Sequence, residues 1–182
     1  SYRNRIYLAP AGYSNAGSED GYRYFVLSFN SNITDVKVTS PEECEVHIWY
    51  LLEDGRIPGE ESLKALKEYL EEKDRKPITD RVVVKAPMQK AYDINLTYYI
   101  NRSDSNRASV IQEQVGQAVK DYILWQSTKI GRDINPDELI SRIKTAGAKR
   151  VELAAPAFTV VPDDSVASLG DDMVTYGGLE ND

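Results

Sequence analysis

Residues 92–100 alternate between two kinds of side chain without interruption. One face would carry Tyr92, Ile94, Leu96, Tyr98 and Ile100, and the other Asp93, Asn95, Thr97 and Tyr99. A period of two predicts a β-strand with one buried face. Residues 108–122 follow with apolar side chains at helical spacing, and this stripe keeps one face for about five turns. A one-faced strand beside a long one-faced helix predicts a mixed α+β unit.

The best-marked helix start in the chain is at Asn135. Asn135 is the expected N-cap, Pro136 occupies the first helical position, and Glu138 occupies the capping-box position. Ile134 and Leu139 are spaced for a hydrophobic staple. The apolar face and the C-terminal stop are expected from Leu139, Ile140, Ile143, Ala146 and Gly147. At the helix before it, Asp104 or Ser105 is the expected cap.

Further strands are expected after this helix. Val151 and Leu153 indicate one, and Val174 marks a possible site of another, so the segment reads β-α-α-β. The chain from Pro162 onward is rich in Asp and Gly, and we interpret Asp163-Asp164 and Asp171-Asp172 as solvated turns. The last residues, 176–182, are a candidate for poor order.

The first half of the chain predicts a second, smaller unit. Residues 35–39 and 46–52 read as strands, and the latter alternates with period two. A helix with Leu63, Leu66 and Leu70 on one face follows Gly59, and residues 82–84 supply a third strand. Residues 33–86 therefore read β-β-α-β. Upstream, residues 22–28 fit either a short helix or a strand, and we favour a helix-rich lead-in.

These patterns together predict an α+β fold of two small units of mixed strands and helices, β-β-α-β and then β-α-α-β, after a partly helical lead-in. The expected boundaries are residues 1–30 for the lead-in, 31–87 for the first domain and 88–182 for the second, with its acidic and flexible tail. Ala86-Pro87-Met88 is the expected junction.

Composition excludes several classes of partner. A net charge of −7 argues against duplex DNA or an anionic membrane, because phosphate contacts need clustered Lys and Arg. No apolar run approaches the ~20 residues of a membrane span. The single cysteine, Cys44, excludes an internal disulfide framework and suits a reducing cytoplasm. The abrupt start at Ser1 suggests a fragment of a longer protein.

No catalytic, cofactor or metal site is predicted. His47 is the only histidine, and it has no nucleophile or carboxylate at motif spacing. Nothing near Cys44 in the sequence would activate its thiol. The Asp163-Asp164 and Asp171-Asp172 pairs lack the ligand spacing of an EF-hand loop, so a solvated acidic loop is favoured over a calcium site.

Aromatic side chains are the remaining candidates for function. Trp49, Tyr99 and Tyr24 fall on faces that the alternation assigns to solvent or to a partner, and such residues are common interface anchors. For Trp49, cover by another part of the chain is an equal alternative. Core burial is favoured for Trp125, and Arg132, between two expected helices, is left open as a contact residue.

The order of motifs resembles baseplate J-like proteins, the wedge components of contractile phage tails and related injection machines. The resemblance rests on Pro77-Ile78-Thr79-Asp80, Tyr92-Asp93-Ile94, Trp125-Gln126 and Gly131-Arg132-Asp133-Ile134. It spans roughly residues 2–177. The chain departs from the family at Glu42-Glu43-Cys44-Glu45, where such proteins often carry a glycine in a tighter turn.

The resemblance implies a structural baseplate subunit without enzymatic activity or cofactors. It implies contacts with other wedge and tail proteins, self-association in the assembled ring, no nucleic-acid partner, and a place in the virion tail baseplate after synthesis in the host cytoplasm. It also implies that an N-terminal region of the family is missing here. Trp49, Tyr99 and Arg132 are the hypothesised contact residues. A baseplate-associated cell-wall hydrolase and a stand-alone peptide-binding module stay open as alternatives.

Overall fold

The computed structural model describes residues 18–72 and 74–182 and has the predicted α+β class. The chain divides into two compact units. The first runs to Met88 and includes Thr128–Ile130, and the second comprises Gln89–Ser127 and Gly131–Asp182. Residues 1–17 of the expected lead-in lie outside the described residues.

Within residues 18–72 and 74–88, the first unit shows two α-helices, three strands and one 3-10 turn. In chain order they are α2 (Glu19–Phe29), β1 (Ile33–Thr39), β2 (Glu45–Leu52), η1 (Glu53–Gly55), α3 (Glu60–Glu71) and β3 (Arg81–Lys85). The strand and helix order from β1 to β3 is the predicted β-β-α-β. The ambiguous segment 22–28 is helical, and the Ser18 side chain caps its helix by accepting from the Gly21 amide at 3.0 Å.

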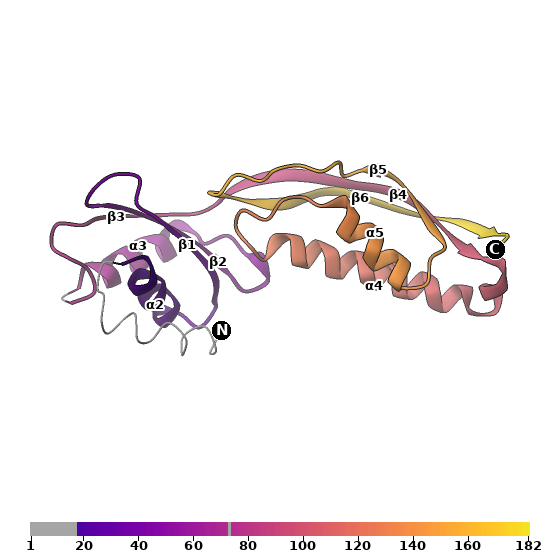
Figure 1. Ribbon diagram of the computed structural model, residues 1–182. Helices are drawn as coiled ribbons and strands as arrows, with labels where there is room; N and C mark the ends of the chain where they lie inside the picture. Colours follow the sequence, from indigo (N-terminus) through magenta and orange to yellow (C-terminus); the bar gives the residue numbers. More distant parts are fainter. Residues whose placement is uncertain (1–17, 73) are drawn as a thin grey trace. The chain divides into compact units, whose positions relative to one another are not determined.

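The first sheet has the strand order β1-β2-β3. β1 is antiparallel to β2, and β3 is parallel to β2, because α3 carries the chain back between them. Helices α2 and α3 lie against this sheet (Figure 1). The core between the helices and the sheet comprises Tyr22, Val26, Leu27, Ile33, Val36, Val38, Val46, Ile48, Tyr50, Leu66, Leu70 and Val82.

The loop before β2 carries the one departure from the family pattern noted in the sequence. Cys44 there has a φ of 61°, in the left-handed region where glycine is favoured. This explains why a glycine suits that turn. The Cys44 side chain is exposed.

The second unit is a three-stranded sheet covered by two helices. Its elements are β4 (Met88–Asn101), η2 (Arg102–Arg107), α4 (Ala108–Ser127), α5 (Pro136–Thr145), β5 (Arg150–Ala155) and β6 (Ser165–Glu180). The sheet order is β5-β4-β6, and β5 is antiparallel to β4. Gly170 on β6 lies beside Asp93 on β4, and Gly177 lies beside Tyr99. The residue numbers of the two strands therefore rise in the same direction, so β6 runs parallel to β4.

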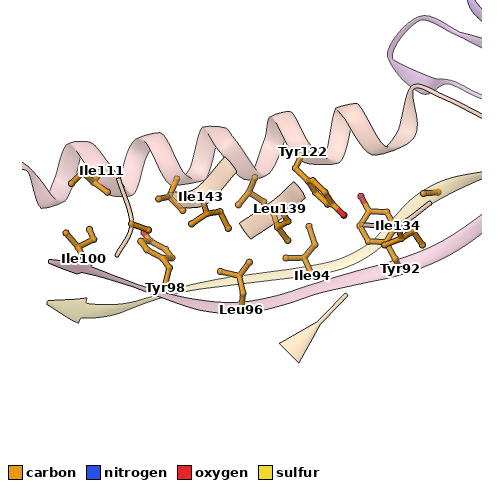
Figure 2. Close-up of a cluster of buried hydrophobic side chains, with 14 of the residues drawn as sticks. Tyr92, Ile94, Leu96, Tyr98, Ile100, Ile111, Tyr122, Ile134, Leu139 and Ile143 are labelled. Atoms are coloured by element: carbon orange, nitrogen blue, oxygen red, sulfur yellow. The ribbon is translucent and has the colours of Figure 1, made fainter. Parts of the chain in front are cut away.

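The apolar face of β4 forms the core of this unit. Figure 2 shows its side chains directed toward α4 and α5, where they meet the apolar stripes of both helices. Its largest buried side chains are those of Tyr92, Tyr98 and Tyr122, and Ile94, Leu96, Ile100 and Ile111 are fully buried around them. The predicted alternation of β4 and the predicted stripe of α4 are therefore confirmed, and each supplies the surface that buries the other.

Three local expectations are wrong. Asp171-Asp172 is part of β6 and not a turn, because this acidic stretch pairs with β4; the Asp171 amide donates to Asp93 Oδ1 at 2.9 Å. The strand also continues to Glu180, so most of the expected flexible tail is ordered. Finally, Asp104 and Ser105 lie inside the 3-10 helix η2, and α4 begins at Ala108.

The start of α5 follows the sequence signal except at the capping box. Asn135 Oδ1 accepts from the Asp137 amide at 3.0 Å, with Pro136 at the first position, and the staple residue Ile134 is buried. The return bond expected from Glu138 is replaced, because the Asn135 amide donates to Gln126 Oε1 at 3.4 Å and Glu138 accepts from Arg142 at 2.9 Å.

Candidate interaction surfaces

Tyr99 lies on the face of β4 opposite the core, in a cluster that crosses all three strands of the second sheet. The Arg150 guanidinium carbon lies 4.0 Å from the centroid of the Tyr99 ring, and the Tyr99 hydroxyl donates to Glu152 Oε2 at 3.3 Å. Arg150 also reaches Glu180 on β6. We call Tyr99, Arg150, Glu152 and Glu180 the Tyr99 cluster.

Arg150 is the centre of the Tyr99 cluster. Its Nε and Nη2 atoms donate to the two carboxylate oxygens of Glu180 at 2.8 and 2.5 Å, and Nη1 donates to Glu152 Oε1 at 2.7 Å. The hydrogen bonds from Arg150 lower the pKa of Glu180, and those to Glu180 and then Glu152 raise the pKa of Arg150. The arginine thus ties the two edge strands together across the central strand.

The Trp125-Gln126 motif and the Gly131-Arg132-Asp133 motif meet in the loop between α4 and α5. Gln126 is fully buried, and its Nε2 donates to the carbonyls of Arg132 at 3.2 Å and Asp133 at 2.8 Å. Asp133 Oδ1 accepts from the Val161 amide at 2.9 Å. Gly131, at a φ of 75°, donates from its amide to Ser165 O at 2.8 Å. These motifs shape the loop.

Arg132 lies against Trp125 in this loop. Its guanidinium carbon is 4.2 Å from the Trp125 ring centroid, and Nη1 donates to the Trp125 carbonyl. Arg142 of α5 approaches the same ring at 5.4 Å, so two cations lie over one indole. The ring itself is only partly buried where it packs against the core, so the core burial expected for Trp125 is met in part.

Trp49 lies on the face of β2 opposite Ile48 and Tyr50, and only 9% of its surface is exposed. The His47 ring centroid is 5.8 Å from that of Trp49, and Lys85 Nζ is 5.7 Å from the indole centroid. Of the exposed aromatics expected from the sequence, Tyr24 is half-buried and contacts Phe25 with a centroid distance of 5.3 Å.

Comparison with known proteins decides the family. The baseplate J-like central domain matches residues 14–86, and the baseplate J-like protein C-terminal domain matches residues 92–175. The chain belongs to the baseplate J-like family. The resemblance drawn from the sequence motifs is thereby confirmed.

This baseplate J-like chain is 33% identical over 171 residues to baseplate protein J of Escherichia phage P2, across 92% of this chain and 55% of that protein. It therefore spans about half the length of the curated relative it matches. Its fold is also similar to a chain in the cryo-EM structure of the anti-feeding prophage (AFP) baseplate, 6-fold symmetrised, with a TM-score of 0.60. That match has 12% identity and covers 86% of this chain and 38% of the other, so it concerns the fold.

The baseplate J-like chain shows no metal site among residues 18–72 and 74–182. His47 Nε2 lies 2.7 Å from Glu45 Oε1, and this hydrogen bond lowers the pKa of Glu45. Within the same described residues, no helix is long and apolar enough to cross a membrane.

Two surface hollows could not be anticipated from the sequence. A groove of about 450 Å³ lies between α4 and α5 and is lined by Gln117, Asp121, Arg142 and Thr145, among others. A second, of about 460 Å³, lies beside the turn before β3 and is lined by Glu71, Glu72, Asp74, Lys76 and Ile78. Both hollows depend on how the helices pack against neighbouring segments, and this packing cannot be inferred from the periodic spacing of apolar residues in the sequence.

Proposed function

We propose that this chain is a structural, non-enzymatic part of a phage or prophage tail baseplate wedge, and that it assembles into the baseplate ring through protein–protein contacts. The observation that carries the proposal is the match to both baseplate J-like domains together with 33% identity to the phage P2 baseplate protein. The location is the virion tail baseplate, after synthesis in the host cytoplasm.

The architecture supports an assembly role in physical terms. In each unit helices cover one face of a three-stranded sheet, and the outer strands of each sheet are edges. Sheet edges and polar sheet faces are ready docking surfaces for other proteins. The acidic net charge disfavours nonspecific contact with packaged DNA.

Trp49, Tyr99 and Arg132 remain our proposed contact residues, and the structure allows them to be ranked. Tyr99 comes first, because its half-exposed ring lies on the polar face of β4. Arg132 is next, because its guanidinium stacks on the Trp125 ring and is held in place while it stays partly exposed. Trp49 comes last, because at 9% exposure it would act mainly by supporting Lys85 and His47.

The proposal is tested by tagging the full-length protein in cells that express the encoding phage or prophage cluster and identifying co-purified proteins by mass spectrometry. Recovery of other baseplate and tail proteins in fixed ratios is expected, with self-association only in assembled complexes. An equally acidic tagged protein serves as the control. Recovery of no tail protein above that control contradicts the proposal.

The contact residues are tested in the same assay with paired variants. Tyr99→Phe keeps the ring under Arg150, whereas Tyr99→Ala removes it. We expect Tyr99→Ala to lower recovery of partners much more than Tyr99→Phe, and more than its change in thermal midpoint explains. Equal recovery from both variants would remove Tyr99 from the interface.

A further inference from the structure

Figure 1 shows the sheet and α5 on one side of α4, and the opposite side of this helix carries exposed residues. Residues three, four or seven positions apart share one face of a helix, so these residues form a single stripe. We call it the α4 stripe, and its members are Val110, Glu113, Gly116, Gln117, Lys120 and Leu124, all exposed. The outer face of a surface helix is ordinarily polar and solvated. Three features set the α4 stripe apart from such a face.

The first feature is an apolar side chain at each end of the stripe. Val110 is 53% exposed and Leu124 is 44% exposed, and neither belongs to the core under the helix. The core side of α4 is formed by other residues, namely Ile111, Val115, Val119 and Tyr122. The stripe therefore has a polar middle and two apolar ends that its own unit does not bury.

The second feature is Gly116, in the middle of the stripe. Glycine weakens a helix interior relative to alanine, and it suits positions where another backbone approaches closely. A Cβ on Gly116 would find nothing within 4 Å, so no described part of the chain requires glycine there. A hollow of about 500 Å³ lies at this position, lined by Val110, Glu113, Gln114, Gly116, Gln117 and Lys120. It can accept a side chain from a second helix.

The third feature is a pair of opposite charges, Glu113 and Lys120, about two helical turns apart. Both side chains are exposed, and neither forms an ion pair with a residue in 18–72 or 74–182. Neither has an opposite charge three or four positions away on α4, where ion pairs within a helix form. The two charges are therefore available to a partner, and their order along the helix determines which surface complements them.

A second copy of α4 in the antiparallel direction complements the stripe. A two-fold axis between Gly116 and Gln117 places Glu113 of each copy opposite Lys120 of the other, because both lie equally far from that axis. The same axis brings Gln117 over the Gly116 hollow of the other copy, and Val110 beside Leu124. A parallel arrangement would place like charges at the same level, which is disfavoured. The stripe is therefore self-complementary in one orientation, as a two-fold contact requires.

Asp121, at the side of the stripe, is compatible with this contact. Its Oδ1 accepts from Gln117 Nε2 at 2.9 Å, which leaves Oδ2 without a partner among the described residues. In the antiparallel arrangement Gln114 of the other copy lies on the same flank and can donate to Oδ2. The two Asp121 carboxylates lie on opposite sides of the axis, about 13 Å apart along the helix, so they do not oppose the contact.

We propose that the α4 stripe is the surface through which two copies of this chain pair about a two-fold axis in the assembly. The contact is only one helix wide, so it is expected to form in assembled particles and not in dilute solution. The inference rests on the proposed baseplate function, to which it adds the surface of self-association.

The test is disulfide formation across the axis in purified particles that contain the full-length protein. Cys44→Gly suits the positive φ at that position and removes the native thiol, and Gln117→Cys then places a thiol next to the axis. Rapid formation of a disulfide-linked dimer of this protein is expected. Val110→Cys is the matched control, because its two copies would lie about 20 Å apart along the helix, beyond the reach of a disulfide.

Two results would overturn the proposal while the baseplate function stands. In one, the protein is present in the particles but Gln117→Cys gives no dimer, or becomes linked to a different protein. In the other, Val110→Cys forms a dimer as fast as Gln117→Cys, which the antiparallel contact does not allow. Absence of the full-length protein from the particles contradicts the baseplate function instead.

Charge reversal tests the ion pairs in the protein that carries Gln117→Cys. Glu113→Lys and Lys120→Glu should each slow disulfide formation about fivefold or more, because each puts two like-charged pairs into the contact. The double variant keeps the net charge of its parent and restores both pairs, so it should form the disulfide at nearly the parent rate. None of these changes should shift the thermal midpoint, since both side chains are exposed. Equal rates in all four proteins, or a double variant as slow as the single ones, overturn the proposal.

Discussion

The ring of Tyr99 lies directly against Gly177, so that a Cβ on Gly177 would stand 2.4 Å from Tyr99 Cε1 and 2.9 Å from the Thr97 methyl. The pairing of β6 with β4 therefore requires a residue without a side chain at position 177. Arg150 stacks on the same tyrosine ring, which is consequently in contact with groups from both edge strands.

Gly177→Ala should destabilise the second unit by about 1–3 kcal/mol, because the new methyl must displace the Tyr99 ring from its place under Arg150. Gly116→Ala is the matched control, since nothing lies within 4 Å of its Cβ position and it is inside α4. It should be stabilising by roughly 0.5–1 kcal/mol. Urea denaturation of both variants measures the difference, and equal midpoints would contradict the packing described.

Gln126→Ala should cost about 2–3 kcal/mol, because it leaves the carbonyls of Arg132 and Asp133 without their donor in a buried loop. Gln117 lies on the exposed side of the same helix. Gln117→Ala removes only a hydrogen bond to Asp121 at 2.9 Å and should cost a few tenths of a kcal/mol. Thermal denaturation compares the two variants. A small effect at Gln126 would mean that this loop does not depend on the amide.

Tyr92 and Tyr122 provide a matched pair of buried hydroxyls. The Tyr92 hydroxyl has no hydrogen-bond partner among the described residues, whereas the Tyr122 hydroxyl donates to Asn135 O at 3.1 Å. Burial raises the pKa of both, that of Tyr122 to about 12. Tyr92→Phe should therefore be neutral or stabilising, and Tyr122→Phe should cost about 1 kcal/mol. The opposite order in chemical denaturation would refute this assignment.

Stability should fall on acidification through the ion pair of Glu180. The pKa of Glu180 is lower in the folded chain than its ordinary value of 4.5, because Arg150 donates hydrogen bonds to the carboxylate. The stabilisation is therefore complete above about pH 4.5 and is lost as the pH falls through the lower, folded pKa. Glu180→Gln should flatten the stability profile below that pH. Identical acid profiles of the variant and the wild type would rule out this contribution.

Period-two and helical patterns were sufficient to predict β4, α3 and α5, because each of these elements buries one regular face. β2 was also predicted, although it buries both faces from Ile48 to Leu51. A strand near Val174 was expected, but not the full length of β6 from Ser165 to Glu180, because its acidic and glycine-rich sequence has poor strand propensity and the strand is held by pairing with β4. Nor could these patterns predict the Tyr99 cluster, since Arg150 and Glu180 meet only after three strands align. The sequence left open whether Trp49 is exposed or covered by another part of the chain. Its low exposure depends on neighbouring side chains that the alternation of β2 does not identify.

The most direct test of the baseplate assignment is quantitative mass spectrometry of purified contractile particles from cells that carry the encoding gene. If the assignment is correct, the full-length protein will be present in a fixed ratio to the other baseplate proteins and will stay with them when the tail is dissociated. If the protein is abundant in the cell lysate but absent from the purified particles, it is not a baseplate subunit.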